Sequence, residues 1–261
     1  MKANYHTHTH YCGHASGNAS DYVKEAIKKG FTVIGISDHA PNSRVNDHNV
    51  RMKEHKIDQY MKDIEDAQAK YGENITIYKG LEVEFFYDHD EYYKDLIKKT
   101  DYLIHGQHYV SKTKEMHNLQ SGFALKTKED IYLYSEYLCD AMDSGYFDAL
   151  AHPDLYMCGY RDFDKHAEEV AHIICKKAQD TKTVLEYNAN GYRRGASITP
   201  QGIKPPYPRN EFWEIAKSYG IETIIGSDCH NPNFLYDDTV KEAEDEYLKL
   251  GLNMLDKLDI K

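Results

Sequence analysis

The segment ANYHTH at residues 3–8 runs from an expected β-strand into two histidines. His6 and His8 are two positions apart, so in an extended strand their side chains point to the same side. Two imidazole rings on one side of a strand can chelate one metal ion. The segment therefore predicts a strand that carries a metal site at its carboxyl end.

The same arrangement recurs along the chain. Short apolar runs rich in Val, Ile and Tyr alternate with longer charged stretches of helical period, which is the βαβα pattern of a parallel α/β fold. We expect seven strands, at residues 3–8, 32–37, 75–83, 102–108, 149–152, 184–188 and 223–227. Amphipathic stretches predict helices at residues 19–29, 56–71, 91–99, 128–144, 164–178, 209–218 and 238–250.

Residue types that bind metals stand at the carboxyl ends of these strands. In chain order they are His6 with His8, His39, Glu82, His108, His152 and Asp228 with His230, while Asn188 ends strand six. In a β/α barrel the loops after the strands meet on one face, where active sites are found. These residues would therefore meet in space although they are far apart in sequence.

The nitrogen and carboxylate ligands suit Zn²⁺, Mn²⁺ or Fe²⁺, and the sequence does not choose among them. His105 and His108 face opposite sides of a regular strand, so we expect one inward ligand, His108, which is nearer the strand end. Cys12 and Cys229 are expected to be packing residues. Solvated or packing roles are expected for the other histidines, namely His48, His55, His89, His117, His166 and His172.

The composition predicts an ordinary folded chain, with one domain over residues 1–261. Apolar residues make up 41% and charged residues 29% of the 261 positions, which excludes disorder as the main state. Apolar runs are much shorter than the roughly 20 residues of a membrane-spanning helix, and the cysteines form no CxxC pair, so we expect a cytoplasmic protein with no membrane partner. The formal charge of −11 argues against nucleic acid and favours a small molecule as the partner.

Six ordered motifs resemble those of the polymerase and histidinol phosphatase (PHP) superfamily. They are HTHTHYCGHA at 6–15, SDHA at 37–40, GLEVEF at 80–85, HGQH at 105–108, AHPD at 151–154 and GSDCH at 226–230. The HxHxxxCxH opening with Cys12 and His14, the GLE box and the stretch at 186–193 resemble the histidinol-phosphate phosphatase branch.

This resemblance implies a distorted (β/α)₇ TIM-like barrel with two to three divalent metal ions at its C-terminal face. It implies three ligand sets: His6, His8, Glu82 and Asp228; Glu82, His108 and His152; and His14, His39 and His230. Glu82 would bridge the first two ions. A hydroxide held between two such ions would be a strong nucleophile for in-line attack on phosphorus.

The remaining parts of a monoester site are a proton donor and an anion clamp. Asp228 and His230, together with the bridging Glu82, are the candidate catalytic residues, and the first two are candidate acids for the leaving group. Arg161 and Arg193 follow strands five and six, and their guanidinium forks are expected to bind phosphate. The sequence leaves open whether Arg193 or Arg194 does so. Asn188 is expected to contact the substrate or support the ligands.

The leading hypothesis is a metal-dependent phosphatase that converts L-histidinol phosphate to L-histidinol and inorganic phosphate in histidine biosynthesis. The first alternative is a phosphoesterase or exonuclease that acts on nucleotides. A metal-binding protein without catalysis is the second alternative, and it is disfavoured because storage needs no phosphate-binding arginine. The sequence leaves the oligomeric state open.

Overall fold

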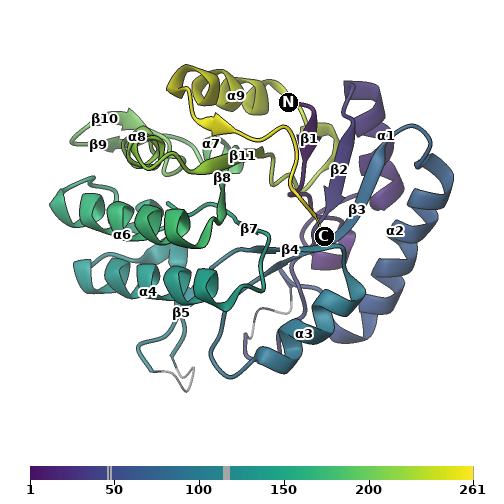
Figure 1. Ribbon diagram of the computed structural model, residues 1–261, viewed down its shortest axis with the longest axis horizontal. Coiled ribbons are helices and arrows are strands. Elements are labelled where there is room, and N and C mark those ends of the chain that lie inside the picture. Colours follow the sequence, from purple (N-terminus) through teal and green to yellow (C-terminus); the bar gives the residue numbers. More distant parts are fainter. Residues whose placement is uncertain (46, 48, 114–117, 261) are drawn as a thin grey trace.

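The computed structural model describes residues 1–45, 47, 49–113 and 118–260, and a curled sheet of parallel strands lies at its centre (Figure 1). Within these residues the sheet has eight strands in the order β1-β2-β3-β4-β7-β8-β11-β12. They are Ala3–Asn4, Val33–Ile36, Thr76–Val83, Tyr102–His105, Ala149–Leu150, Val184–Asn188, Glu222–Gly226 and Asn253–Met254. Their spatial order follows the chain, as in successive β/α units.

Helices cover the outside of the sheet (Figure 1). The long ones are α1 Ala19–Lys29, α2 Ile57–Tyr71, α3 Asp90–Lys99, α4 Lys128–Ser144, α6 Lys165–Thr181, α8 Asn210–Ser218 and α9 Asp238–Leu250. Each buries an apolar stripe, and in α2 this stripe includes Tyr60, Ile64 and Ala67, spaced by three and four residues. In the described part of the chain, no helix is long and apolar enough to cross a membrane.

Shorter helices and strands lie in the loops between these elements. They are α5 Met157–Tyr160, α7 Asn190–Arg193, the hairpins β5 Tyr109–Val110 with β6 Gln120–Ser121 and β9 Ser197–Thr199 with β10 Gly202–Lys204, and 3₁₀ turns at His10–Cys12, Glu54–Lys56, Gly122–Ala124 and Pro232–Phe234. The segments β5–β6, α5 and α7 follow the carboxyl ends of β4, β7 and β8, so they surround one end of the sheet.

The sheet curls until the segment that follows β1 meets the segment that follows β11. Thr7 and Cys229 form a parallel bridge, in which the His8 amide donates to the Cys229 carbonyl over 3.0 Å. At the opposite end β12 pairs with β11, and the Leu258 amide donates to the Tyr5 hydroxyl over 3.0 Å. The fold is therefore the expected distorted TIM-like barrel, with β12 added to the seven predicted strands.

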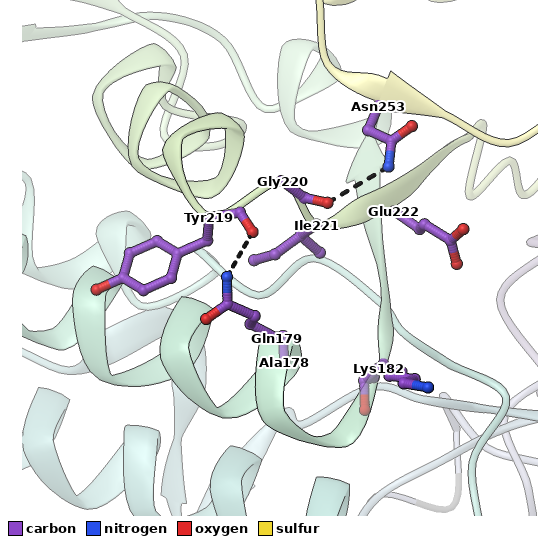
Figure 2. A pocket seen from close by; sticks show the side chains of 9 residues that line it. Ala178, Gln179, Lys182, Tyr219, Gly220, Ile221, Glu222 and Asn253 are labelled. Carbon is purple, nitrogen blue, oxygen red and sulfur yellow. Dashed lines mark hydrogen bonds between the residues drawn. The ribbon is translucent and has the colours of Figure 1, made fainter.

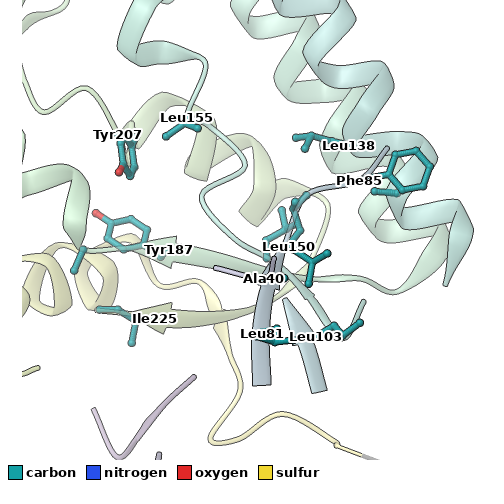
Figure 3. Packing of buried hydrophobic residues seen from close by; sticks show 14 of the residues in the cluster. Ala40, Leu81, Phe85, Leu103, Leu138, Leu150, Leu155, Tyr187, Tyr207 and Ile225 are labelled. Atoms are coloured by element: carbon teal, nitrogen blue, oxygen red, sulfur yellow. The ribbon is translucent and has the colours of Figure 1, made fainter. Parts of the chain in front are cut away.

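Alternate residues of the strands build two apolar layers. Leu81, Leu103 and Leu150 belong to the main core between sheet and helices (Figure 3). Tyr102 and Ile104 flank Leu103 in sequence but belong to a second cluster, to which nearly every strand contributes. This inner cluster fills the amino-terminal half of the barrel. The carboxyl-terminal half is left for polar side chains.

Three predicted strands end two or more residues earlier than expected. β1 ends at Asn4 and not at His8, β4 ends at His105, and β7 ends at Leu150. Beyond β1, side chains replace strand partners, because the Thr7 amide donates to Ser37 Oγ and the Thr9 amide to Asp38 Oδ1. The expected ligands therefore stand mostly just beyond the strands.

Candidate active site

The nine side chains that the sequence predicts as metal ligands lie together at the carboxyl end of the barrel. Glu82, which is 1% exposed, is at their centre. Its Oε1 lies 2.9 Å from His152 Nε2 and 3.5 Å from His108 Nε2. Its Oε2 lies 2.8 Å from His39 Nδ1 and 3.3 Å from His6 Nε2. One carboxylate thus faces rings from four different loops.

Asp228 forms a second centre beside Glu82. Its Oδ1 lies 3.1 Å from His8 Nε2, 3.6 Å from His6 Nε2 and 3.7 Å from His230 Nδ1. His6, His8 and Asp228 offer ligand atoms that all lie within 4.8 Å of one another. This spacing would allow the three side chains to share one ion, and their assignment with Glu82 to one ligand set stays a prediction.

The other two predicted sets are not separated in space. His39 groups with Glu82 and His108, and it also groups with His8 and His230. The ring of His14, which is exposed, lies 4.4 Å from that of His230 between centroids. The division of these residues among two or three ions therefore stays a prediction.

Unpaired buried atoms show that the cluster fits divalent ions. Within the described residues, no hydrogen bond of acceptable geometry reaches His6 Nε2, His8 Nε2, His39 Nδ1, Glu82 Oε2 or His230 Nε2. Buried polar atoms in folded proteins nearly always have a partner. Imidazole nitrogens and carboxylate oxygens are the ligands that Zn²⁺, Mn²⁺ and Fe²⁺ accept, so bound ions would satisfy all five atoms.

Four members of the cluster have protonation states that suit a cation, whereas at His6 the effect of burial is overcome by Glu186 and Asp228, which raise the pKa of the ring. Burial raises the pKa of Glu82, but the neighbouring His39 and His6 oppose this effect and the pKa lies well below its usual value. The pKa of Asp228 shows the same balance, with burial opposed by His6 and His8. Burial lowers the pKa of His8 and of His39. At neutral pH these carboxylates are ionised and these two rings are neutral, which are the metal-binding forms.

Two of the predicted ligands sit on strained backbone. His152 has φ of 33° and Asp228 has φ of 43°, a region that residues other than glycine rarely occupy. Such strain persists only where the surrounding structure holds it, and it clusters at functional sites. Both side chains are aimed at the cluster by these conformations.

Glu186 and Asn188 form hydrogen bonds with the predicted ligands His6 and Asp228. The two oxygens of Glu186 lie 2.9 and 3.0 Å from His6 Nδ1. Asn188 is fully buried, and its amide nitrogen donates to Glu186 over 2.9 Å and to Asp228 over 3.2 Å. Of the two roles that the sequence leaves for Asn188, this position favours support of the ligands over contact with substrate.

A cavity of about 200 Å³ opens above the cluster. Predicted ligands on its wall are His14, His39, His108, Asp228 and His230. The rest of the wall is formed by Asp47, Val50, Arg51, Tyr109, Phe123, Asn190, Arg194 and Tyr207. The guanidinium of Arg194 lies 4.2 Å from the centre of the Phe123 ring, and its Nε donates to the Tyr207 hydroxyl over 3.0 Å. An arginine is thus held at the cavity wall by two aromatic residues.

The structure does not bring Arg193 or Arg161 to this cavity. Both Nη atoms of Arg193 donate to Asp237 over 2.7 Å, and Nη2 also donates to the Phe234 carbonyl. Arg161 is exposed and does not line the cavity. The predicted phosphate contact of Arg193 thus stays a prediction; its neighbour Arg194 lines the cavity, while the carboxylate of Asp237 occupies the fork of Arg193.

A second cavity, of about 270 Å³, lies at the opposite end of the barrel (Figure 2). It is bounded by the end of α6 and the start of β11. Gln179 and Asn253 donate there to the carbonyls of Tyr219 and Gly220. Its charged lining residues, Lys182 and Glu222, form no metal-ligand group, so its chemistry does not compete with that of the first cavity.

The remaining histidines and cysteines mostly have packing or surface roles. His105 donates from Nε2 to Gln107 Oε1 over 2.7 Å, and its ring stacks on Phe147. Cys12 is buried and donates to the Thr9 carbonyl, although its sulfur lies near His14 and His230. Cys229 is 1% exposed. His48 and His117 lie outside the described residues, and His55, His89, His166 and His172 belong to none of the metal-ligand groups.

Residues 4–190 match the model of the PHP domain. The chain belongs to the PHP domain family. This match covers the β1, β2, β3, β4, β7 and β8 ligand loops, and only Asp228 and His230 of the cluster lie beyond it.

Similar PHP proteins are known by sequence and by structure. The chain is 27% identical over 250 residues to a probable histidinol-phosphatase of Deinococcus radiodurans, with 92% of each chain covered. A histidinol phosphate phosphatase of Lactococcus lactis, crystallised with zinc, L-histidinol and phosphate, has a TM-score of 0.75 at 18% identity and covers 98% of this chain and 96% of its own. A putative histidinol phosphatase of Listeria monocytogenes has a TM-score of 0.73 at 19% identity, covering 92% and 99%. At these identities the two structures show a shared fold.

Three residues near the cluster of predicted metal ligands are absent from the site residues that the sequence predicts. They are Glu84, Arg51 and Tyr207. A signal for Glu84 was present, because it follows Glu82 by two positions and so shares its side of an extended chain. Arg51 and Tyr207 lie in loops, and no periodicity places a loop side chain.

Proposed function

We propose that this protein is a metal-dependent phosphatase that hydrolyses a small phosphate monoester, L-histidinol phosphate, to L-histidinol and inorganic phosphate. The observation that carries the proposal is the set of unpaired ligand atoms beneath a small cavity that holds an arginine. Divalent ions bound there would supply Lewis acidity, which neutralises phosphate oxygens and lowers the pKa of water. Similarity to proteins named histidinol-phosphatases supports the choice of substrate.

The residues of the chain divide into three tasks. His6, His8, His14, His39, Glu82, His108, His152, Asp228 and His230 would hold the two or three ions. Arg194 would bind phosphate through its Nη groups, oriented by the Tyr207 hydroxyl at Nε. Asp228 and His230 face the cavity and are the candidate groups to hold the proton that the departing oxygen needs.

The cavity favours a small substrate. Its volume of about 200 Å³ is below the roughly 300 to 1,000 Å³ of sites for drug-sized ligands. The chain has a negative net charge, whereas binding of an extended nucleic-acid backbone requires a basic surface. Both observations favour a monoester over a polymer.

A substrate panel tests the proposal. L-Histidinol phosphate, mononucleotides, sugar phosphates, serine phosphate and an aryl phosphate are compared under one metal condition. We expect kcat/KM for L-histidinol phosphate to exceed the others by about 10², or roughly 2.7 kcal/mol of transition-state binding. A higher value for a mononucleotide would reject the substrate but keep the phosphatase, whereas metal-loaded protein that hydrolyses no monoester would reject the function itself.

A further inference from the structure

A chain of buried charges runs outward from the metal cluster behind His108. Glu84 Oε1 lies 3.1 Å from His108 Nδ1. The guanidinium of Arg51 meets the same carboxylate with Nη1 and Nη2, each over 2.6 Å. On its far side Arg51 donates to both oxygens of Asp47 over 2.9 and 3.1 Å. Glu84 is 1% and Arg51 is 5% exposed, so water contributes little to either charge.

The position of Glu84 has a direct consequence for the His108 ring. The other ring nitrogen, Nε2, points to Glu82 Oε1 at 3.5 Å, on the side of the proposed ions. A neutral imidazole carries one N–H, and only the other nitrogen can bind a metal. Because Glu84 accepts from Nδ1, it holds the proton there and leaves the Nε2 lone pair for the ion.

Arg51 in turn fixes Glu84. A carboxylate buried without a counter-charge would be strongly destabilising. The planar fork of arginine matches both oxygens of a carboxylate, which fixes the orientation of Glu84 as well as its charge. Asp47 holds the opposite edge of the guanidinium, so the fork cannot turn away from Glu84.

We propose that Glu84 and Arg51 are positioning residues that fix the tautomer and orientation of His108 and thereby set the affinity of one metal ion. This inference rests on the metal centre of the proposed function. Arg51 lies on the wall of the cavity beside the cluster, but this role requires no contact of either residue with the substrate. Carboxylates that orient metal-binding histidines typically contribute 10- to 100-fold to metal affinity.

Glu84→Gln is the sharpest test, because its volume is conserved but its amide cannot serve both neighbours. If the amide oxygen accepts from His108, the NH₂ group opposes an N–H of Arg51. Arg51→Lys keeps the charge but loses the fork, and it provides a second variant if the first folds poorly. Zn²⁺ binding to stripped protein is measured by titration against a competing chelator.

The expected result is selective. Glu84→Gln should bind one equivalent of Zn²⁺ about 10- to 100-fold more weakly and the rest as in the unmodified protein, with a smaller loss in Arg51→Lys. Added Zn²⁺ should restore kcat for L-histidinol phosphate in both variants, since the defect is one of occupancy. Asp237→Asn is the matched control, because it breaks the bidentate pair with Arg193, which contacts no predicted ligand.

Two outcomes overturn the inference. One is unchanged affinity for every equivalent in both variants. The other is a parallel weakening of all equivalents in the variants and in Asp237→Asn alike, which would indicate a general structural defect. If the unmodified protein binds no Zn²⁺, the metal centre of the proposed function fails before the variants are compared, so the two failures are distinguishable.

Discussion

At the scale of single residues, close approach determines which side chains reach the ions. A Cβ atom on Gly106 would lie 2.0 Å from Glu82 Oε1, and one on Gly226 would lie 1.7 Å from Glu186 Oε1. No real carbon atom can occupy either position unless the carboxylate moves. Glycine at these two positions is therefore required for Glu82 and Glu186 to occupy their places in the cluster.

Gly226→Ala should weaken metal binding through Glu186. The new methyl group would push the Glu186 carboxylate away from His6 Nδ1, so His6 would lose its orienting partner and bind its ion about 10- to 100-fold more weakly. Chelator competition measures this change. Gly145→Ala is the control: its φ of 69° costs roughly 1 to 2 kcal/mol of stability, but nothing lies within 4 Å of the added Cβ, so metal affinity should not change. Equal metal affinity in both variants would contradict the role of Glu186.

Adjacent arginines give a second test at this scale. Arg194→Met should lower kcat/KM for the monoester by roughly 10² or more, because a charge-assisted phosphate contact is worth on the order of 3 kcal/mol. Arg193→Met removes the same charge one residue away but breaks contacts with Asp237 and Phe234, which lie outside the cavity lining, so kcat/KM should change less than about threefold. Steady-state kinetics at equal metal content decide between them. The reverse order of effects would restore the phosphate contact to Arg193.

At the scale of elements, the length of a helix or strand determines whether the sequence can predict it. The seven long helices repeat an apolar stripe over at least nine residues, and such a period identifies a helix and its buried face. The strand β12 has two exposed residues, Asn253 and Met254, and no pattern marks it. The turn α7 has only four residues, so the sequence could not show that consecutive residues there point about 100° apart. That is why Arg193 and Arg194 were indistinguishable before the structure.

The segment that contains β12 should stabilise the barrel from its amino-terminal end. Leu258 is 3% exposed and packs in the inner cluster with Tyr5 and Ile224. Leu258→Ala should lower the free energy of unfolding by about 2 to 5 kcal/mol, since a buried cavity would replace its side chain. Leu248→Ala on α9 provides the control, because Leu248 is 55% exposed and should change stability by less than about 0.5 kcal/mol. Urea titration of both variants measures the difference, and equal midpoints would show that the segment contributes nothing.

At the scale of the whole molecule, the barrel gathers ligands that are remote in sequence into one histidine-rich cluster with unpaired ligand atoms. His6 follows the first strand and His230 follows β11, and every ligand loop between them contributes a side chain. The sequence could reveal this convergence because parallel strands put all their carboxyl ends on one face. The sequence could not assign each ring to one ion. His39, for example, groups both with Glu82 and His108 and with His8 and His230, at distances that only the packing determines.

Metal ions should therefore link the halves of the barrel and raise its thermal stability. A ligand present at 100 times its Kd stabilises the folded state by about 2.7 kcal/mol, which for a chain of this size raises Tm by roughly 5 to 10 °C. Thermal scans of stripped protein with and without Zn²⁺ measure this shift. Glu82→Gln should abolish most of it, since Glu82 faces rings from four loops, whereas Glu65→Gln on the exposed side of α2 should keep it. If Zn²⁺ raised the Tm of Glu82→Gln as much as that of the unmodified protein, the ions would have to bind elsewhere, and the cluster around Glu82 would not be the metal centre.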